Sequence, residues 1–189
     1  MFFDGVYSVF EYSGKKVLDV GGFIGDSTTY FIANGAREVV IVEPLLHEFV
    51  RRNIEHNNFR NVVVLPFAFT RTKGKITLRK VGDAFSGASM YREGGEPTTV
   101  ETITPEEIFA KYGEFDIAKL DCEGCEYEVL FDVLDHVKEG VVLEFHHPTF
   151  KFKRKMKKML DQIKSNGMEV IIIENRGDRS IVKISKNKR

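Results

Sequence analysis

The chain has 189 residues, of which 42% are hydrophobic and 30% charged, and its 28 Lys/Arg balance its 28 Asp/Glu. This length predicts one domain, and the composition excludes a wholly disordered chain. No apolar run approaches the ~18 residues of a membrane-spanning helix, and no basic region precedes an apolar stretch at the N-terminus. Two cysteines are too few for a disulfide scaffold, so we expect a reducing, cytoplasmic location and no membrane partner.

Charge is distributed unevenly along the chain. Residues 150–189 carry 13 Lys/Arg and 4 Asp/Glu, whereas residues 1–149 carry 15 and 24. A basic segment is typical of a surface that meets an anionic partner, and equally of a solvated helix face with a charged terminus. Both interpretations stay open.

Strand and helix patterns alternate along the first third of the chain. The run at residues 38–43 is β-branched and apolar on both faces, as in a strand buried within a parallel sheet. The pattern predicts strands at residues 16–20, 38–43 and 61–67, a helix that Ser27 caps and that ends at Gly35, and a helix from Pro44 to about Asn57.

The middle of the chain, at about residues 70–103, differs in character. Glycines recur there, and the stretches 75–81 and 98–103 alternate between apolar and polar residues. This pattern favours an inserted β-hairpin or ordered loop over another strand–helix unit.

Alternation then resumes and ends in a hairpin. Thr104 and Glu107 form a capping-box pattern that starts a helix ending at Tyr112. Further strands are predicted at residues 115–121, 141–145, 168–174 and 180–185, with helices at 127–134 and 152–166. We therefore expect an α/β fold over residues 1–189: one doubly wound, seven-stranded, mostly parallel sheet with helices on both faces and one antiparallel strand.

Ligands of such sheets bind at the carboxyl ends of the strands, where two features stand out. The glycine-rich run at residues 19–27 follows the first strand, but it lacks the Gly-Lys-Ser/Thr of a Walker A loop and is not a strict GxGxxG. Glu43 ends the second strand, where a carboxylate can accept hydrogen bonds from both hydroxyls of a ribose. These two features predict a nucleotide-like ligand, although a glycine-rich turn without a ligand remains an alternative. The spacing suits NAD and S-adenosylmethionine equally.

A charged cluster at residues 119–126 ends the fourth strand. Lys119 and Asp121 are predicted on one face of that strand, so an ion pair between them is expected. Charges in an otherwise apolar setting are costly unless they are paired or used in function. The cluster is therefore either a functional site or a structural charge network.

Three motifs together resemble the FkbM family of S-adenosylmethionine-dependent methyltransferases. They are VLDVGGFIGDS at residues 17–27, Glu43-Pro44, and KLDCEGCE at residues 119–126, and the resemblance spans about residues 3–144. It implies the class I methyltransferase fold, with strand order 3-2-1-4-5-7-6 and strand seven antiparallel. Gly22 departs from the family's usual alanine, and the two cysteines replace apolar or small residues.

The resemblance also implies which residues bind S-adenosylmethionine. Asp26-Ser27 either hold its charged groups or cap a helix, and Phe67 either flanks the adenine or belongs to the core. The implied cofactor-binding set is Asp19, Gly21, Gly22, Phe23, Gly25, Asp26, Ser27, Glu43, Pro44, Phe67, Ala68 and Asp121.

Catalysis at a hydroxyl acceptor needs alignment and a base. The polar groups at or after strands four and five are the candidates, and we select Asp121, Glu123 and His146, with Glu144 nearby. A histidine has a suitable intrinsic pKa, although this one also suits an ordinary loop. A single CxxC is a poor zinc pattern, so no metal site is expected, and Cys122 and Cys125 are predicted to be small buried residues.

The predicted function is O-methylation of a small molecule or saccharide with S-adenosylmethionine. Three alternatives remain: an RNA methyltransferase that uses the basic helix at 151–164, a cofactor-binding protein that needs a partner or does not turn over, and an NAD-dependent dehydrogenase. The predicted terminal hairpin disfavours the last. The acceptor and the oligomeric state stay open.

Overall fold

The computed structural model describes residues 5–80 and 95–187. Within them a seven-stranded sheet has the order β3-β2-β1-β7-β8-β10-β9, and β10 runs antiparallel to both of its neighbours. Counted along the chain within this sheet, the order is 3-2-1-4-5-7-6, which confirms the predicted fold class. The strands are β1 (Lys16–Val20), β2 (Glu38–Val42), β3 (Val62–Leu65), β7 (Phe115–Leu120), β8 (Val137–His146), β9 (Glu169–Arg176) and β10 (Arg179–Ser185).

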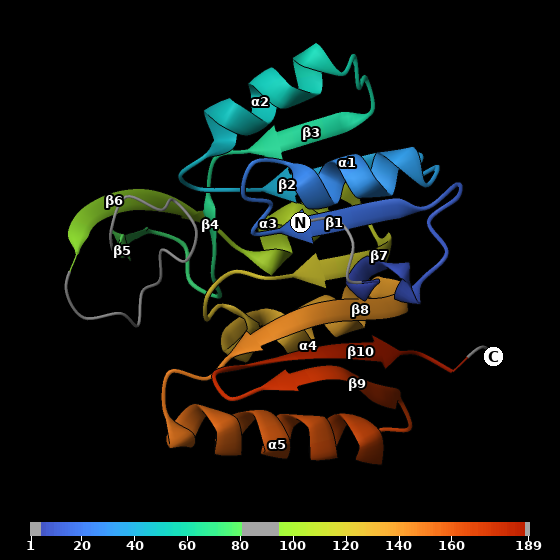
Figure 1. The fold of residues 1–189 in the computed structure, drawn as a ribbon, viewed down its shortest axis with the longest axis vertical. Coiled ribbons are helices and arrows are strands. Elements are labelled where there is room, and N and C mark those ends of the chain that lie inside the picture. The colour runs from blue at the N-terminus through green and yellow to red at the C-terminus, as the bar shows by residue number, and fades with distance from the viewer. Residues whose placement is uncertain (1–4, 81–94, 188–189) are drawn as a thin grey trace.

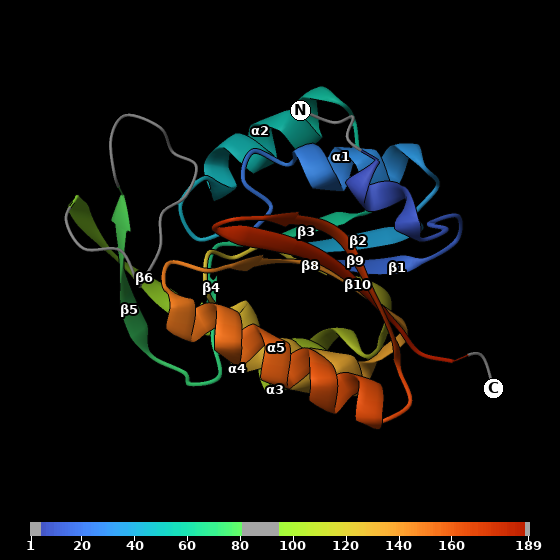
Figure 2. The same cartoon turned by 60° about the horizontal axis from the view of Figure 1, so that its bottom comes forward.

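Helices cover both faces of this sheet. Figure 2 shows α1 and α2 on one face, and α3, α4 and α5 on the other. All five residues of β1 are buried between these layers, including the charged Lys16 and Asp19, and its apolar residues Val17, Leu18 and Val20 occupy both faces of the strand. The helices are η1 (Val6–Val9, a 3-10 turn), α1 (Asp26–Ala33), α2 (His47–His56), α3 (Pro105–Tyr112), α4 (Glu126–His136) and α5 (Phe150–Ser165).

A smaller sheet lies beyond the carboxyl ends of the parallel strands (Figure 1). It consists of β4 (Ala68–Phe69), β5 (Lys75–Lys80) and β6 (Glu96–Ile103), and β5 pairs with β6 antiparallel, as the alternating sequence predicts. Residues 81–94, part of the predicted insertion, lie outside the described residues. That the chain is a single domain stays a prediction.

Two predicted helix starts are wrong for one physical reason. The Ser27 hydroxyl does not cap α1; Gly25 is the N-cap residue, and Ser27 instead donates to Asp19. The second helix begins at His47 rather than Pro44, because the Glu43 carboxylate accepts the backbone N–H groups of the residues after Pro44. In both places a buried carboxylate competes for the groups that local sequence rules assign to the helix.

The capping box of α3 is present as predicted. Thr104 Oγ1 accepts from Glu107 N, and the Glu107 carboxylate accepts from Thr104 N. Among the described helices, none combines the length and the apolar character needed to cross a membrane.

Candidate functional site

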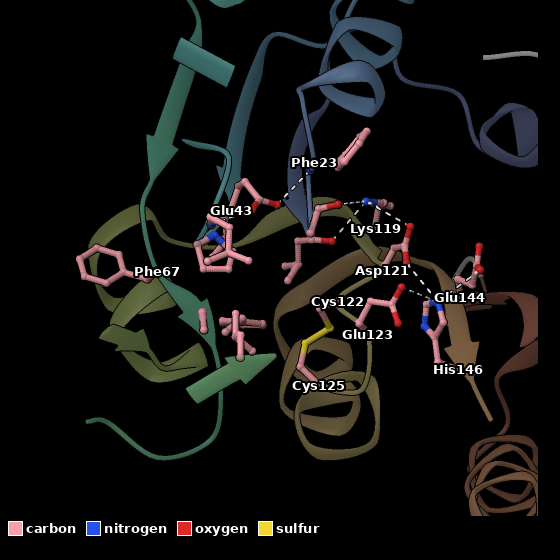
Figure 3. Close-up of a pocket in the computed structure, with 18 of the residues that line it drawn as sticks. Phe23, Glu43, Phe67, Lys119, Asp121, Cys122, Glu123, Cys125, Glu144 and His146 are labelled. Carbon is pink, nitrogen blue, oxygen red and sulfur yellow. Dashed lines mark hydrogen bonds and ion pairs between the residues drawn. A yellow bond between two sulfur atoms is a disulfide. The ribbon is translucent and has the colours of Figure 1, made fainter. Parts of the chain in front are cut away.

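A cavity of about 440 Å³ opens at the carboxyl ends of β1, β2, β7 and β8, facing the β5–β6 hairpin (Figure 3). This volume lies within the usual range of small-molecule sites. Residues of the predicted cofactor set that line it are Gly21, Phe23, Asp26, Glu43, Pro44, Phe67, Ala68 and Asp121. The predicted catalytic residues Glu123 and His146 line it as well, together with Asp121. Asp19, Gly22, Gly25 and Ser27 do not.

The glycine-rich turn packs directly on the end of β7. Gly21 has φ +73, and a Cβ there would lie 1.7 Å from the carbonyl oxygen of Asp121. Only glycine fits so close to another backbone. Phe23, two residues on, also adopts a left-handed conformation, with φ 51. The turn therefore brings its backbone to the cavity at a conformational cost, which is typical of binding loops.

Asp19 lies beneath this turn and outside the cavity. Its Oδ2 accepts hydrogen bonds from Ser27 Oγ at 2.6 Å and Thr28 Oγ1 at 2.7 Å, and its Oδ1 lies 3.4 Å from Lys119 Nζ. The carboxylate is fully buried. These contacts fasten the start of α1 to β1, so Asp19 and Ser27 support the turn rather than face a ligand.

Glu43 joins the turn after β1 to the turn after β2. Its Oε2 accepts from Phe23 N at 3.0 Å, and its Oε1 accepts from Leu45 N at 2.9 Å and Leu46 N at 3.0 Å. Burial raises the pKa of Glu43, and the three N–H donors act against that rise. Because Oε2 accepts one such bond, it retains acceptor capacity for a hydroxyl donor in the cavity.

Lys119 is a buried cation between the two sides of the cavity. Its Nζ donates to Gly21 O at 2.5 Å and lies 3.9 Å from Asp121 Oδ2, so the expected ion pair with Asp121 is present. Burial lowers the pKa of Lys119, but the carboxylates of Asp19 and Asp121 outweigh burial and raise it. The ammonium therefore stays charged and ties the glycine turn to the end of β7.

The imidazole of His146 lies among carboxylates on the opposite side (Figure 3). Its Nε2 is 3.4 Å from Glu144 Oε1, 3.6 Å from Glu123 Oε1 and 3.9 Å from Asp121 Oδ1. Burial lowers the pKa of His146, but the neighbouring carboxylates, led by Glu126, raise it to about 9. In this arrangement the imidazole holds its proton at neutral pH, which does not suit the predicted role of a base.

Several residues that line the cavity were not among the predicted site residues. Arg179 is the first residue of β10, and antiparallel pairing sets it opposite His146. Its Nη1 donates to Glu144 Oε1 at 3.1 Å. The register of the predicted closing hairpin against the fifth strand is the signal that locates Arg179. Tyr7, Ile76 and Leu78 also line the cavity.

Cys122 and Cys125 are joined by a disulfide, with Cα atoms 5.5 Å apart, and both line the cavity. The predicted burial holds for Cys125, whereas Cys122 is half-buried, and the bond between them was not predicted. Between them, Glu123 (φ 55) and Gly124 (φ 128) turn the chain back on itself at the start of α4. Glu126 holds this turn, since its carboxylate accepts from Cys122 N at 2.9 Å and Gly124 N at 2.7 Å.

Solved structures share this fold. Precorrin-6y C5,15-methyltransferase from Geobacter metallireducens GS-15 aligns at 13% identity and TM-score 0.57, covering 97% of this chain and 85% of that one. SMU.1697c from Streptococcus mutans, in complex with SAH, aligns at 12% identity and TM-score 0.63, covering 95% of this chain and 93% of that one. Magnesium protoporphyrin IX methyltransferase (ChlM) from Synechocystis PCC 6803, with bound SAM, aligns at 11% identity and TM-score 0.57, covering 96% of this chain and 74% of that one.

The search of curated proteins found no match. The family model described as the methyltransferase FkbM domain matches residues 19–170, which include both the glycine turn and the charged cluster. This match decides between the two cofactors that the spacing left open, and it rules out the dehydrogenase alternative. The chain belongs to the FkbM family of S-adenosylmethionine-dependent methyltransferases.

Proposed function

We propose that this methyltransferase transfers a methyl group from S-adenosylmethionine to a hydroxyl oxygen of a small molecule or saccharide. The observation that carries the proposal is that one cavity has two chemically different ends. The donor end comprises Gly21, Phe23 and Asp26 of the glycine turn together with Glu43, Pro44, Phe67 and Ala68. The acceptor end comprises Asp121, Glu123, Glu144 and His146.

The residues of the donor end fit S-adenosylmethionine. The remaining acceptor capacity of Glu43 Oε2 suits a ribose hydroxyl, and Gly21, which has no side chain, lines the cavity where the methionine portion would lie. Phe67 and Ala68, after β3, offer an apolar surface to the adenine. When bound, the cofactor supplies a methyl group activated by a positively charged sulfur.

The acceptor end suits a hydroxyl substrate. The oxygens of Asp121 and Glu123 can accept its hydrogen bond, and the protonated imidazole of His146 can donate one to a second oxygen. These contacts orient a lone pair of the hydroxyl oxygen toward the methyl group for in-line displacement, in which alignment supplies much of the rate. We therefore assign Asp121, Glu123 and His146 to the binding and alignment of the acceptor.

The basic helix is separate from this site. Of the described residues that line the cavity, none belongs to α5. RNA as the acceptor thus has no support from the site itself, and it stays a prediction that a gel shift tests: neutralising lysines of 151–164 would have to weaken RNA binding. A protein that binds the cofactor without turnover likewise stays an alternative, which predicts no product in any acceptor screen.

The first test is calorimetric titration with S-adenosylhomocysteine. We expect micromolar binding that Glu43→Ala weakens tenfold or more, equivalent to about 1.4 kcal/mol. Glu48→Ala on α2, which removes a carboxylate exposed to 64%, is the matched control and should bind like the wild type. Absence of binding at millimolar ligand would overturn the assignment of the donor end.

The second test is an acceptor screen followed by mass spectrometry. The proposal requires that the labelled methyl group be found on oxygen, in a product that survives mild acid as an ether does. Transfer to nitrogen, carbon or RNA would contradict it. Asp121→Asn should lower turnover while the affinity for S-adenosylhomocysteine changes by less than about threefold, since alignment of the acceptor is what it loses.

A further inference from the structure

We propose that Asp121, Glu144 and His146 form a binding site for a divalent cation of the Mn²⁺ or Mg²⁺ class at the acceptor end of the cavity. The cation would replace the proton on His146 Nε2, and in the metal-bound site it would hold the acceptor oxygen in place of the hydrogen bond from this imidazole. Its catalytic role rests on the proposed O-methyl transfer, whereas the binding site stands on its own geometry. No metal site is expected from the sequence, because the lone CxxC is the only ligand pattern that local spacing presents.

The ligand atoms already lie close to coordination distance from one common point. One atom of each residue lies within 4.8 Å of the other two, and the separations from His146 Nε2 are 3.4 Å to Glu144 Oε1 and 3.9 Å to Asp121 Oδ1. Ligands at about 2.1 Å from an octahedral cation are about 3.0 Å apart when adjacent and about 4.2 Å apart when opposite. Movements of under 1 Å in side-chain ends therefore suffice.

The charge of the surroundings favours a cation. The carboxylates around the His146 ring are those of Asp121, Glu123, Glu126 and Glu144. The permanent cations in contact with this group among the described residues are Lys119 and Arg179, and Lys119 also serves the buried Asp19. Once His146 has lost its proton to act as a ligand, carboxylates outnumber cations by two, or by three with Asp19 included, at a partly buried site. A divalent cation removes most of that excess.

Neighbouring groups are arranged as an outer shell of a metal site. The second ring nitrogen of His146, Nδ1, is buried and faces the fully buried Glu126 carboxylate at 3.5 Å. A carboxylate at that position orients a metal-binding histidine and directs Nε2 to the metal. On the other side, Arg179 holds Glu144 Oε1 at 3.1 Å and fixes the direction of that carboxylate.

The donor set selects the class of metal and of acceptor. Two carboxylates favour Mg²⁺ and Mn²⁺, and an imidazole is accepted more readily by Mn²⁺ than by Mg²⁺. Three protein ligands leave about three positions of an octahedron for other oxygens. Two neighbouring oxygens of one acceptor can take adjacent positions, so we infer an acceptor with a vicinal diol or a hydroxyl next to a carbonyl or carboxylate oxygen.

The cation would help the transfer by making the hydroxyl more acidic. The acceptor O–H bond breaks and its proton passes to bulk water. The oxygen lone pair forms the new O–C bond, the C–S bond breaks, and its electron pair stays on sulfur as the neutral thioether. No oxidation or reduction takes place.

Mn²⁺ binding to the full chain, stripped of metals and free of S-adenosylmethionine, tests the site. We expect titration followed by electron paramagnetic resonance to detect one saturable site per chain. Asp121→Asn, Glu144→Gln and His146→Gln should each weaken it tenfold or more, while the exposed control Glu48→Gln leaves it unchanged. Pulsed spectra should contain the coupling of one imidazole nitrogen, which His146→Gln removes. A melting curve for each variant verifies that it is folded.

The outcomes separate this inference from the proposed function. Folded wild type that binds S-adenosylhomocysteine but shows no saturable Mn²⁺ site overturns the metal site and leaves the donor end intact. Binding of Mn²⁺ that survives in all three folded variants also overturns it. A Mn²⁺ site that the variants abolish supports it even if the acceptor screen places the methyl group on nitrogen, in which case the proposed O-methylation alone fails.

Discussion

The carboxylates at the two ends of the cavity have different partners. At the donor end Glu43 is satisfied by three backbone N–H groups, and the carboxylate holds two turns in place. At the acceptor end Glu123 and Glu144 share one imidazole with two further carboxylates. The donor end is therefore preorganised by the backbone, whereas the acceptor end keeps charge that a ligand can neutralise.

This contrast explains where rigidity and reactivity lie. Backbone donors cannot leave, so the donor end keeps its shape with or without a ligand. Side chains of like charge repel each other, so the acceptor end is stabilised when a cation or a hydrogen-bonded substrate arrives. Four substitutions or treatments test the contrast, in order of expected effect.

Lys119→Met should have the largest effect, because the buried ammonium contacts Gly21 at the donor end and Asp121 at the acceptor end. Without it the buried Asp19 loses its counter-charge, and we expect a loss of about 3–5 kcal/mol in the free energy of unfolding. Urea denaturation measures this loss. The double variant with Asp19→Asn should recover part of it; equal losses in the single and double variants would show that the ion pair is not the cause.

Gly21→Ala should break the donor end by steric means. The added Cβ would meet the backbone of Asp121 at 1.7 Å, in a left-handed conformation that alanine disfavours. We expect a loss of about 3 kcal/mol in unfolding free energy and no detectable binding of S-adenosylhomocysteine. Gly177→Ala, where a Cβ meets nothing within 4 Å, is the control and should leave both unchanged. A folded Gly21→Ala protein of normal affinity would contradict the close packing.

Reduction of the disulfide should loosen the acceptor end. Opening the short loop between Cys122 and Cys125 should lower the unfolding free energy by about 2 kcal/mol. Denaturation with and without dithiothreitol measures the change, and the double serine variant should not respond to the reductant. If both proteins respond equally, the effect of the reductant lies elsewhere.

A matched pair of substitutions compares the two ends most directly. Glu43→Gln loses charge-assisted hydrogen bonds from the backbone and should cost about 1.5 kcal/mol of stability. Glu123→Gln removes one of several crowded carboxylates and should change stability by no more than about 0.5 kcal/mol. Both are read from thermal and urea unfolding. Equal costs would mean that the two ends are alike after all.

Local sequence rules predicted most of the architecture. Hydrophobic runs of strand length alternate with amphipathic ones, and these periodicities depend only on neighbouring residues. The capping box at Thr104 and Glu107 follows from residues three apart, and the expected Lys119–Asp121 pair follows from the two-residue period of a strand.

Local rules failed where a side chain takes a partner that helix and strand periodicity does not assign to it. The start of α2 moved to His47 because the buried Glu43 carboxylate takes the N–H groups before it. The Ser27 hydroxyl does not cap the helix as expected but donates to Asp19, eight residues earlier on β1. The disulfide joins residues only three apart, but the turn between them contains Glu123 in a left-handed conformation that sequence preferences do not favour.

The sequence by itself therefore determined the order and type of the elements, the glycine turn, and the family to which the chain belongs. Only the tertiary structure decided that Glu144, His146 and Arg179 meet Asp121 at one end of the cavity. The reason is physical: strand and helix patterns are set by contacts between near neighbours, whereas β8 and β10 bring their ends to that point through parallel and antiparallel pairing with strands distant in sequence.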